Sequence, residues 1–306
     1  MSPGEKGIVP EADFSSYYGH PIIKEPTWAA LDIAGYLFLG GLAGASSVLA
    51  AGADLQGRPG LAAPAKYAAL GAISVSLVAL VHDLGRPKRF LNMLRVFKPT
   101  SPMSVGVWIL SAYAPMAGVA AASQATGNAP ALGRAGTAGA ALIGPAVAAY
   151  TGVLISDTAV PAWHEGHREM PVVFAGSACV AAAGLGMLAA PLHENGAARR
   201  LGVMGAIIEM TASRVMHKRM GMVSGAYSEG RAGVLMHASE ALTVAGAVGG
   251  IAVARRSRVG AALSGAALMA ASACLRFGVF EAGVKSARDP KYTVIPQRER
   301  ITHAAR

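Results

Sequence analysis

The stretch Trp28–Ala53, WAALDIAGYLFLGGLAGASSVLAAGA, decides the fold that the sequence predicts. It is apolar almost throughout, and Asp32 is its one charged residue. A helix needs about 20 consecutive, mainly apolar residues to cross the hydrocarbon core of a bilayer. The stretch is long enough for one crossing, so it predicts a transmembrane helix.

Seven further apolar runs have lengths that suit a membrane helix. They are Pro64–Val81, Ser104–Ala122, Gly136–Ile155, Pro171–Ala190, Ala198–Ser213, Leu235–Ala254 and Val259–Phe277. The sixth of the eight runs, Ala198–Ser213, is the weakest, because flanking arginines and Glu209 shorten its apolar part. We therefore expect an all-α integral membrane protein, a bundle of about eight transmembrane helices.

The composition supports this class and excludes others. Hydrophobic residues make up 53% of the 306 residues and charged residues 14%, whereas soluble domains carry about 25% charge. The net charge of +10 fits contact with anionic lipid, so we expect membrane lipid as a partner and no nucleic acid. The two cysteines, Cys179 and Cys274, lie in apolar runs and are too few to ligate an iron–sulfur cluster.

An even number of crossings places both termini on one side of the membrane, which we call face A. Face A comprises the N-terminal tail, the connections 82–103, 156–170 and 214–234, and the C-terminal tail. The opposite side, face B, comprises four shorter connections near Arg58, Arg134, Arg199 and Arg255. Of the 27 Lys and Arg residues, 19 lie on face A and 8 on face B, which predicts that face A is cytoplasmic.

The same pattern predicts one transmembrane domain. It spans residues 28–280 and lies between an N-terminal interfacial segment, residues 1–27, and a C-terminal tail, residues 281–306. Seven of the eight histidines lie on face A. Titratable groups therefore gather on one side, which favours a one-sided reaction or docking site over a channel.

The charged motif VHDLGRPKRFLNML, Val81–Leu94, interrupts the apolar pattern after the second run. Gly85 can end that helix, and Pro87 prevents its continuation. Three apolar side chains of the following segment share one helical face: Phe90, Leu94 and Phe97. We expect a short interfacial helix there, and Ser101 or Ser104 can cap the third transmembrane helix.

Ionisable side chains inside membrane helices are candidates for function. Glu209 and Glu240 lie within the sixth and seventh runs, and Asp157 follows the fourth. Two interpretations remain open. The glutamates form structural ion pairs with Arg214 or Arg276, or these carboxylates belong to a proton relay.

Three blocks of the sequence resemble the membrane subunits of the NrfD/polysulfide reductase family. They are DLGRPKRFLNML with KPTSPMSVGVWIL after it, YLFLGGLAGA at Tyr36–Ala45, and AAYTGVLIS with PAW at Ala148–Trp163. The resemblance implies a membrane-anchor, quinone-binding subunit that is not catalytic alone. It would pass electrons between the quinone pool and a ferredoxin-like iron–sulfur subunit, which connects to a molybdopterin catalytic subunit.

The resemblance also implies roles for individual residues. Asp32, Tyr36 and Tyr150 correspond to the quinone pocket, which would take menaquinone or ubiquinone. The charged motif would support this pocket and dock the partner, through His82, Asp83, Gly85, Arg86, Pro87 and Arg89. The family needs no haem, iron–sulfur cluster or metal site in this subunit.

Three alternatives remain open. A haem-b-type anchor would use histidines at the face A ends of helices. An ion-translocating or transport subunit would need a polar path towards face B. A purely structural anchor would make no contact with quinone.

Overall fold

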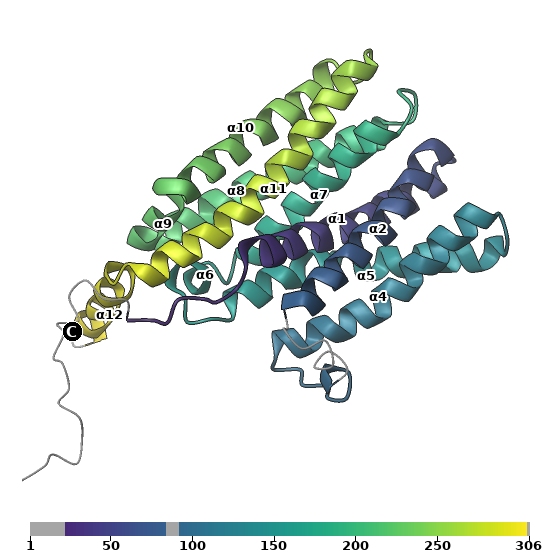
Figure 1. The fold of residues 1–306 in the computed structure, drawn as a ribbon. Coiled ribbons are helices and arrows are strands. Elements are labelled where there is room, and N and C mark those ends of the chain that lie inside the picture. Colours follow the sequence, from purple (N-terminus) through teal and green to yellow (C-terminus); the bar gives the residue numbers. More distant parts are fainter. Residues whose placement is uncertain (1–21, 84–91, 305–306) are drawn as a thin grey trace, which may run out of the picture.

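The computed structural model of the protein describes residues 22–83 and 92–304, with side chains up to Arg298. Within these ranges every regular element is helical, which confirms the predicted all-α class. The long helices run alternately from face A to face B and back (Figure 1). They are α1 (Ala30–Leu55), α2 (Pro59–Asp83), α4 (Pro102–Thr126), α5 (Pro130–Ser156), α7 (Met170–Ala189), α8 (Gly196–Met220), α10 (Gly230–Ala252) and α11 (Arg258–Arg288). Shorter helices lie at face A: α6 (Pro161–Glu165), η1 (Gly221–Ser224), α9 (Gly225–Ser228) and α12 (Lys291–Ala304).

Seven of the described helices are long and apolar enough to cross a membrane, namely α1, α2, α4, α5, α7, α10 and α11. Helix α8 is 25 residues long, like α2, but it carries charged side chains at both ends and Glu209 inside. It contains the weakest predicted run. Because α8 packs along both α7 and α10, it traverses the same layer as they do. The protein is thus an integral membrane helical bundle.

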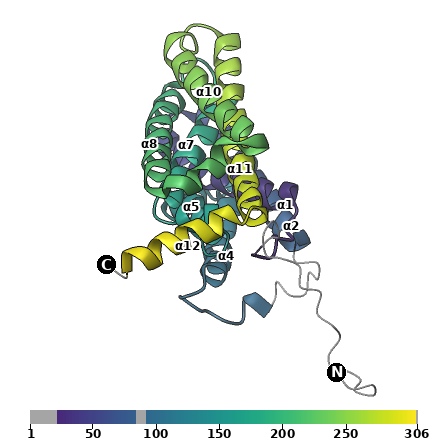
Figure 2. The same cartoon turned by 90° about the vertical axis from the view of Figure 1, so that its left-hand side faces the viewer.

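The long helices form two groups of four. Helices α1, α2, α4 and α5 make the first bundle, and α7, α8, α10 and α11 make the second. The bundles meet where α1 and α5 contact α7, and where α1 contacts α11. Figure 1 shows them side by side, and the turned view of Figure 2 shows α12 lying across face A.

Glycine lets helices approach closely at equivalent places in the two bundles. A Cβ atom on Gly44 of α1 would overlap the backbone of Gly144 in α5. In the second bundle a Cβ on Gly184 of α7 would overlap the backbone of Gly265 in α11. Small residues at such crossings bring the backbones together, and in lipid this packing replaces the hydrophobic drive that holds soluble helices.

Local signals set the helix ends. Ser101 caps α4, because its hydroxyl accepts a hydrogen bond from the amide of Ser104 at 3.5 Å, and Pro102 occupies the first turn. Gly127 ends α4 in the left-handed conformation, with φ of 69°. Helix α11 continues to Arg288, beyond the predicted end at Phe277. The apolar run ends at Phe277, whereas the helix continues through the charged residues that follow it.

The central part of the charged motif lies outside the described residues. This holds for residues 84–91, which include Gly85, Arg86, Pro87 and Arg89. Their roles and the interfacial helix therefore stay predictions. In the part that is described, Phe97 packs edge-on against Trp108 of α4, with ring centroids 6.1 Å apart.

Candidate functional site

The packing of α1 against α2 brings two of the predicted residues together at face A. Asp32 lies in the first turn of α1 and His82 in the last turn of α2. His82 Nδ1 lies 3.0 Å from Asp32 Oδ2, and the His82 side chain is 76% exposed whereas that of Asp32 is 23% exposed. The pair therefore joins a half-buried carboxylate to an imidazole that faces outwards, and Asp83 follows it directly.

Two predicted tyrosines lie one step deeper, on neighbouring helices. Tyr36 follows Asp32 by one turn of α1, and Tyr150 lies in α5; both are buried. Gly40, one turn beyond Tyr36, faces Thr151, with a built Cβ 3.9 Å from Thr151 Cγ2. Each tyrosine is six residues from the face A end of its helix, which is about 9 Å along the axis. They lie at similar depth.

The buried hydroxyl of Tyr150 differs from that of Tyr113 in the same bundle. It finds no hydrogen-bond partner among the described residues. Its ring packs on Gly106 of α4, where any Cβ would overlap it. Tyr113 of α4 is also buried, but its hydroxyl donates to Ala43 O at 2.6 Å and contacts Ser47 Oγ at 2.7 Å. Tyr150 thus keeps a free donor in an apolar surrounding, whereas Tyr113 is satisfied.

The connection between α5 and α7 contains α6, which anchors it at face A. Trp163 of α6 is fully buried, donates from Nε1 to Val279 O at 2.7 Å, and stacks on Trp28 with ring centroids 5.7 Å apart. Gly283 of α11 makes room for it, because a Cβ there would overlap the indole ring. The packing leaves His164 exposed on the outer side of α6.

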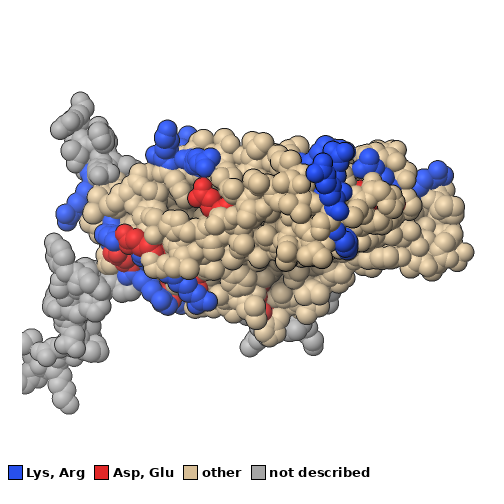
Figure 3. All heavy atoms as spheres, turned by 90° about the horizontal axis from the view of Figure 1, so that it is seen from above, with Lys and Arg blue, Asp and Glu red and all other residues tan. Residues whose placement is uncertain are grey.

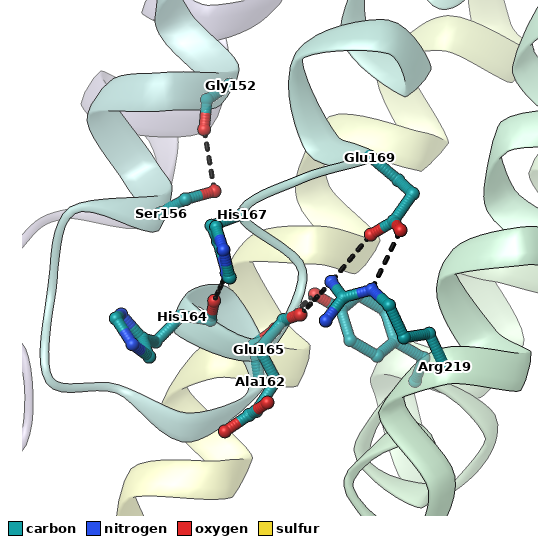
Figure 4. Close-up of polar contacts among 9 residues, drawn as sticks. Gly152, Ser156, Ala162, His164, Glu165, His167, Glu169 and Arg219 are labelled. Carbon is teal, nitrogen blue, oxygen red and sulfur yellow. Dashed lines mark hydrogen bonds and ion pairs between the residues drawn. The ribbon is translucent and has the colours of Figure 1, made fainter.

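Figure 4 shows the polar contacts of this connection. His167 Nδ1 lies 2.9 Å from His164 O, and the two rings stack. Arg219, at the end of α8, donates from Nε and Nη2 to the two carboxylate oxygens of Glu169, at 2.8 and 2.6 Å, and from Nη2 also to Glu165 O. These hydrogen bonds hold the pKa of Glu169 below its ordinary value of 4.5. This pair was not predicted from the sequence, because the two partners lie 50 residues apart in the chain.

The second bundle buries charge. Glu209 of α8 is 3% exposed; its Oε1 accepts from Thr243 of α10 at 3.2 Å, and its Oε2 has no partner among the described residues. Arg276 of α11 is fully buried, donates to Phe174 O at 2.8 Å and lies over the Phe174 ring. Its Nε and Nη1 also lack partners there. The two charges act on each other without direct contact.

Glu209 faces a cavity of about 160 Å³ between α8, α10 and α11. The titratable residues that line it are Glu209, Arg214, His217, Tyr227, His237 and Glu240. Glu240 is exposed and pairs with Arg214 at 3.3 Å, as the ion-pair interpretation predicts. Asp157 is exposed at the end of α5, outside this cavity. The structure therefore brings Glu209 and Glu240 together and leaves Asp157 apart.

The fold and these sites define a multi-pass membrane protein whose histidines and acidic surface groups lie mainly at face A. The family model described as polysulphide reductase, NrfD, matches residues 24–244. The chain belongs to this family, as the sequence blocks predict, and the family comprises membrane subunits of quinone-linked oxidoreductase complexes. No curated protein matches the chain.

Proposed function

We propose that the chain is the quinone-reactive membrane subunit of a multi-subunit oxidoreductase. It exchanges electrons between the quinone pool and a ferredoxin-like iron–sulfur subunit docked on face A, and a molybdopterin subunit carries the catalytic site. The observation that carries the proposal is the buried, unpartnered hydroxyl of Tyr150 in a chain of this family. A donor without an acceptor in an apolar site fits a ligand carbonyl.

The residues around Tyr150 suit such a ligand. A bound quinone supplies a carrier of two electrons and two protons whose carbonyl oxygens need hydrogen bonds. Tyr150 donates one of these hydrogen bonds, and Tyr36 lies at a similar depth in the first bundle. Asp32 and His82 form a hydrogen-bonded pair between this depth and the surface, so they can hold and exchange protons with face A.

The test compares two tyrosines that differ in their partners. We expect Tyr150→Phe to lower quinone-dependent turnover of the purified complex about 10- to 100-fold, because one hydrogen bond to the ligand is lost. Turnover of the soluble subunits with an artificial dye should not change. Tyr113→Phe is the control, since it removes a satisfied hydroxyl from the same bundle, and it should leave quinone turnover within about twofold. Equal turnover in both variants would defeat the proposed role of Tyr150.

We assign partner docking to face A. The exposed rings of His164 and His167 and the described start of the charged motif, His82 and Asp83, lie on this face, where the sequence also predicts the rest of the motif. Within the motif, Arg86→Ala should uncouple the complex from quinone and leave dye-linked activity unchanged.

Purification in mild detergent followed by mass spectrometry should yield an iron–sulfur and a molybdopterin subunit, and solvent extraction should yield menaquinone or ubiquinone. An optical spectrum with haem bands would instead favour the haem-b-type anchor.

The cavity beside Glu209 supports a second role, in proton handling. It offers space for several water molecules next to a buried carboxylate oxygen without a partner. We propose that Glu209 and Glu240 exchange protons with face A. Glu209→Gln should then slow proton uptake during quinone turnover while quinone binding stays unchanged. Unchanged proton uptake would leave Glu240 as the ion-pair partner of Arg214 and Glu209 with a structural role only.

We also propose, from the distribution of Lys and Arg, that face A is cytoplasmic in the cell membrane. Single cysteines introduced at exposed positions test this, for instance His164→Cys on face A and Arg256→Cys on face B. A membrane-impermeant thiol reagent added to intact cells should label only the second variant. Labelling of the first variant alone would reverse the orientation.

A further inference from the structure

Three guanidinium groups converge at face B on Gly196, the first residue of α8. A Cβ built on Gly196 would lie 3.3 Å from Arg58 Nη1, 3.6 Å from Arg199 Nη2 and 3.7 Å from Arg200 Nη1. Nitrogens of three different side chains therefore surround one point. Like charges repel at this separation, so the arrangement calls for an anion between them.

The protein does not supply that anion from its described residues. Glu194 is near in sequence, but it forms no ion pair with these arginines. Its Oε2 accepts from the amide of Leu61 at 3.1 Å, and its Oε1 pairs with His193 at 3.5 Å. Nη1 of Arg58 is buried and has no hydrogen-bond partner among the described residues. A buried charged donor without an acceptor is strongly unfavourable.

Turns from both bundles bring the three arginines together. Arg58 belongs to the turn between α1 and α2, and Gly196 follows the turn between α7 and α8. Asn195 is fully buried and donates to Ala254 O, in the turn between α10 and α11, at 3.0 Å. Its Oδ1 accepts from Arg199 Nε at 2.9 Å. Arg199 is therefore held in place before an anion binds, which lowers the entropy lost on binding.

We propose that Arg58, Arg199 and Arg200 bind a phosphate group, and that the headgroup of an anionic phospholipid supplies it. Guanidinium groups match phosphate oxygens with paired hydrogen bonds, and the start of α8 adds the positive end of a helix dipole. The site lies at the ends of membrane-spanning helices, where lipid headgroups are the abundant phosphates. In Figure 3 the end away from the grey segments carries mainly Lys and Arg, whereas the grey end mixes both signs of charge.

The proposal is tested by lipid binding to the purified, delipidated chain, measured by native mass spectrometry. The probes are phosphatidylglycerol, phosphatidylcholine and inorganic phosphate. The variants are Arg58→Gln and Arg200→Gln. Arg134→Gln is the matched control, because it removes one arginine from the same face in α5, away from Gly196. Thermal unfolding of each lipid-free variant in detergent shows that it is folded.

We expect phosphatidylglycerol to bind more tightly than phosphatidylcholine, and Arg58→Gln or Arg200→Gln to weaken its binding about tenfold each. Arg134→Gln should bind it like the unsubstituted chain. Binding of inorganic phosphate alone, with the same dependence on Arg58, would support the anion site and overturn its assignment to lipid. Equal phosphatidylglycerol binding by all variants would overturn the site itself.

Discussion

The two bundles bury different kinds of polar group. The first bundle buries the hydroxyls of Tyr36, Tyr113 and Tyr150. Its charged groups pair towards the two faces, Asp32 with His82 near face A and the buried Lys66 with Asp54 at 2.7 Å towards face B. The second bundle buries a carboxylate and a guanidinium group, those of Glu209 and Arg276, inside the membrane layer. Both are four-helix arrangements with close glycine crossings. The difference lies in chemistry and not in architecture.

This difference separates two tasks. A neutral donor suits an uncharged carbonyl ligand, because it forms a hydrogen bond without the penalty of a buried charge. Buried charges that act on each other suit either proton exchange or a structural clamp, and removal of one partner leaves the other uncompensated. Substitutions that alter one bundle and leave the other intact test this separation.

The largest effect is expected from Arg276→Met in the second bundle. It removes the hydrogen bond to Phe174 O and the cation–π contact, and it leaves Glu209 without its charged neighbour. We expect the free energy of unfolding to fall by about 3–5 kcal/mol, measured by denaturant titration in detergent. The double variant with Glu209→Gln should lose less than the sum of the single losses.

Arg214→Met is the control for this prediction. Arg214 lies on α8 and pairs with Glu240, but its side chain is 67% exposed. An exposed pair contributes about 0–1 kcal/mol, so this variant should change stability by no more than that. Similar losses for Arg276→Met and Arg214→Met would show that the buried charge of the second bundle is not a structural clamp.

Gly106→Ala in the first bundle should have an intermediate effect. The new methyl group overlaps the ring of Tyr150, which must move. We expect stability to fall by about 1–3 kcal/mol and quinone-dependent turnover to fall as well. Gly118→Ala on the same helix meets no atom within 4 Å and should be neutral or slightly stabilising. If both variants retain full quinone turnover, the position of Tyr150 does not matter for the reaction.

The smallest effect is expected from Glu169→Gln, at the face A edge of the second bundle. The pKa of Glu169 is lower in the folded protein than its ordinary 4.5, so its stabilising contribution is complete above about pH 4.5 and disappears as the pH falls through the folded pKa. We expect a loss of about 1–2 kcal/mol at pH 7. Thermal unfolding between pH 3 and pH 7 should show that the variant is less stable than the parent only at pH values above the folded pKa of Glu169.

The sequence predicted the architecture well and the inter-helix contacts poorly. The apolar runs predicted the membrane-spanning helices, since length and charge alone decide whether a helix spans a bilayer. The contacts of Arg219 with Glu169, of Asp32 with His82, and of Trp163 with Val279 were not predicted. Lipid and protein interior are similarly apolar, so hydropathy does not show which side of a membrane helix faces another helix.

The sequence by itself determined the class, the seven long apolar helices and the family, because each depends on residues close together in the chain. It also determined that most titratable groups lie on face A. Only the tertiary structure decided which buried groups are satisfied. Tyr113 and Tyr150 look alike in sequence, yet one hydroxyl has two partners and the other has none among the described residues. Likewise, Arg58 and Arg199 meet at Gly196 only because the two bundles pack against each other, and that contact depends on the shapes of all the helices between them.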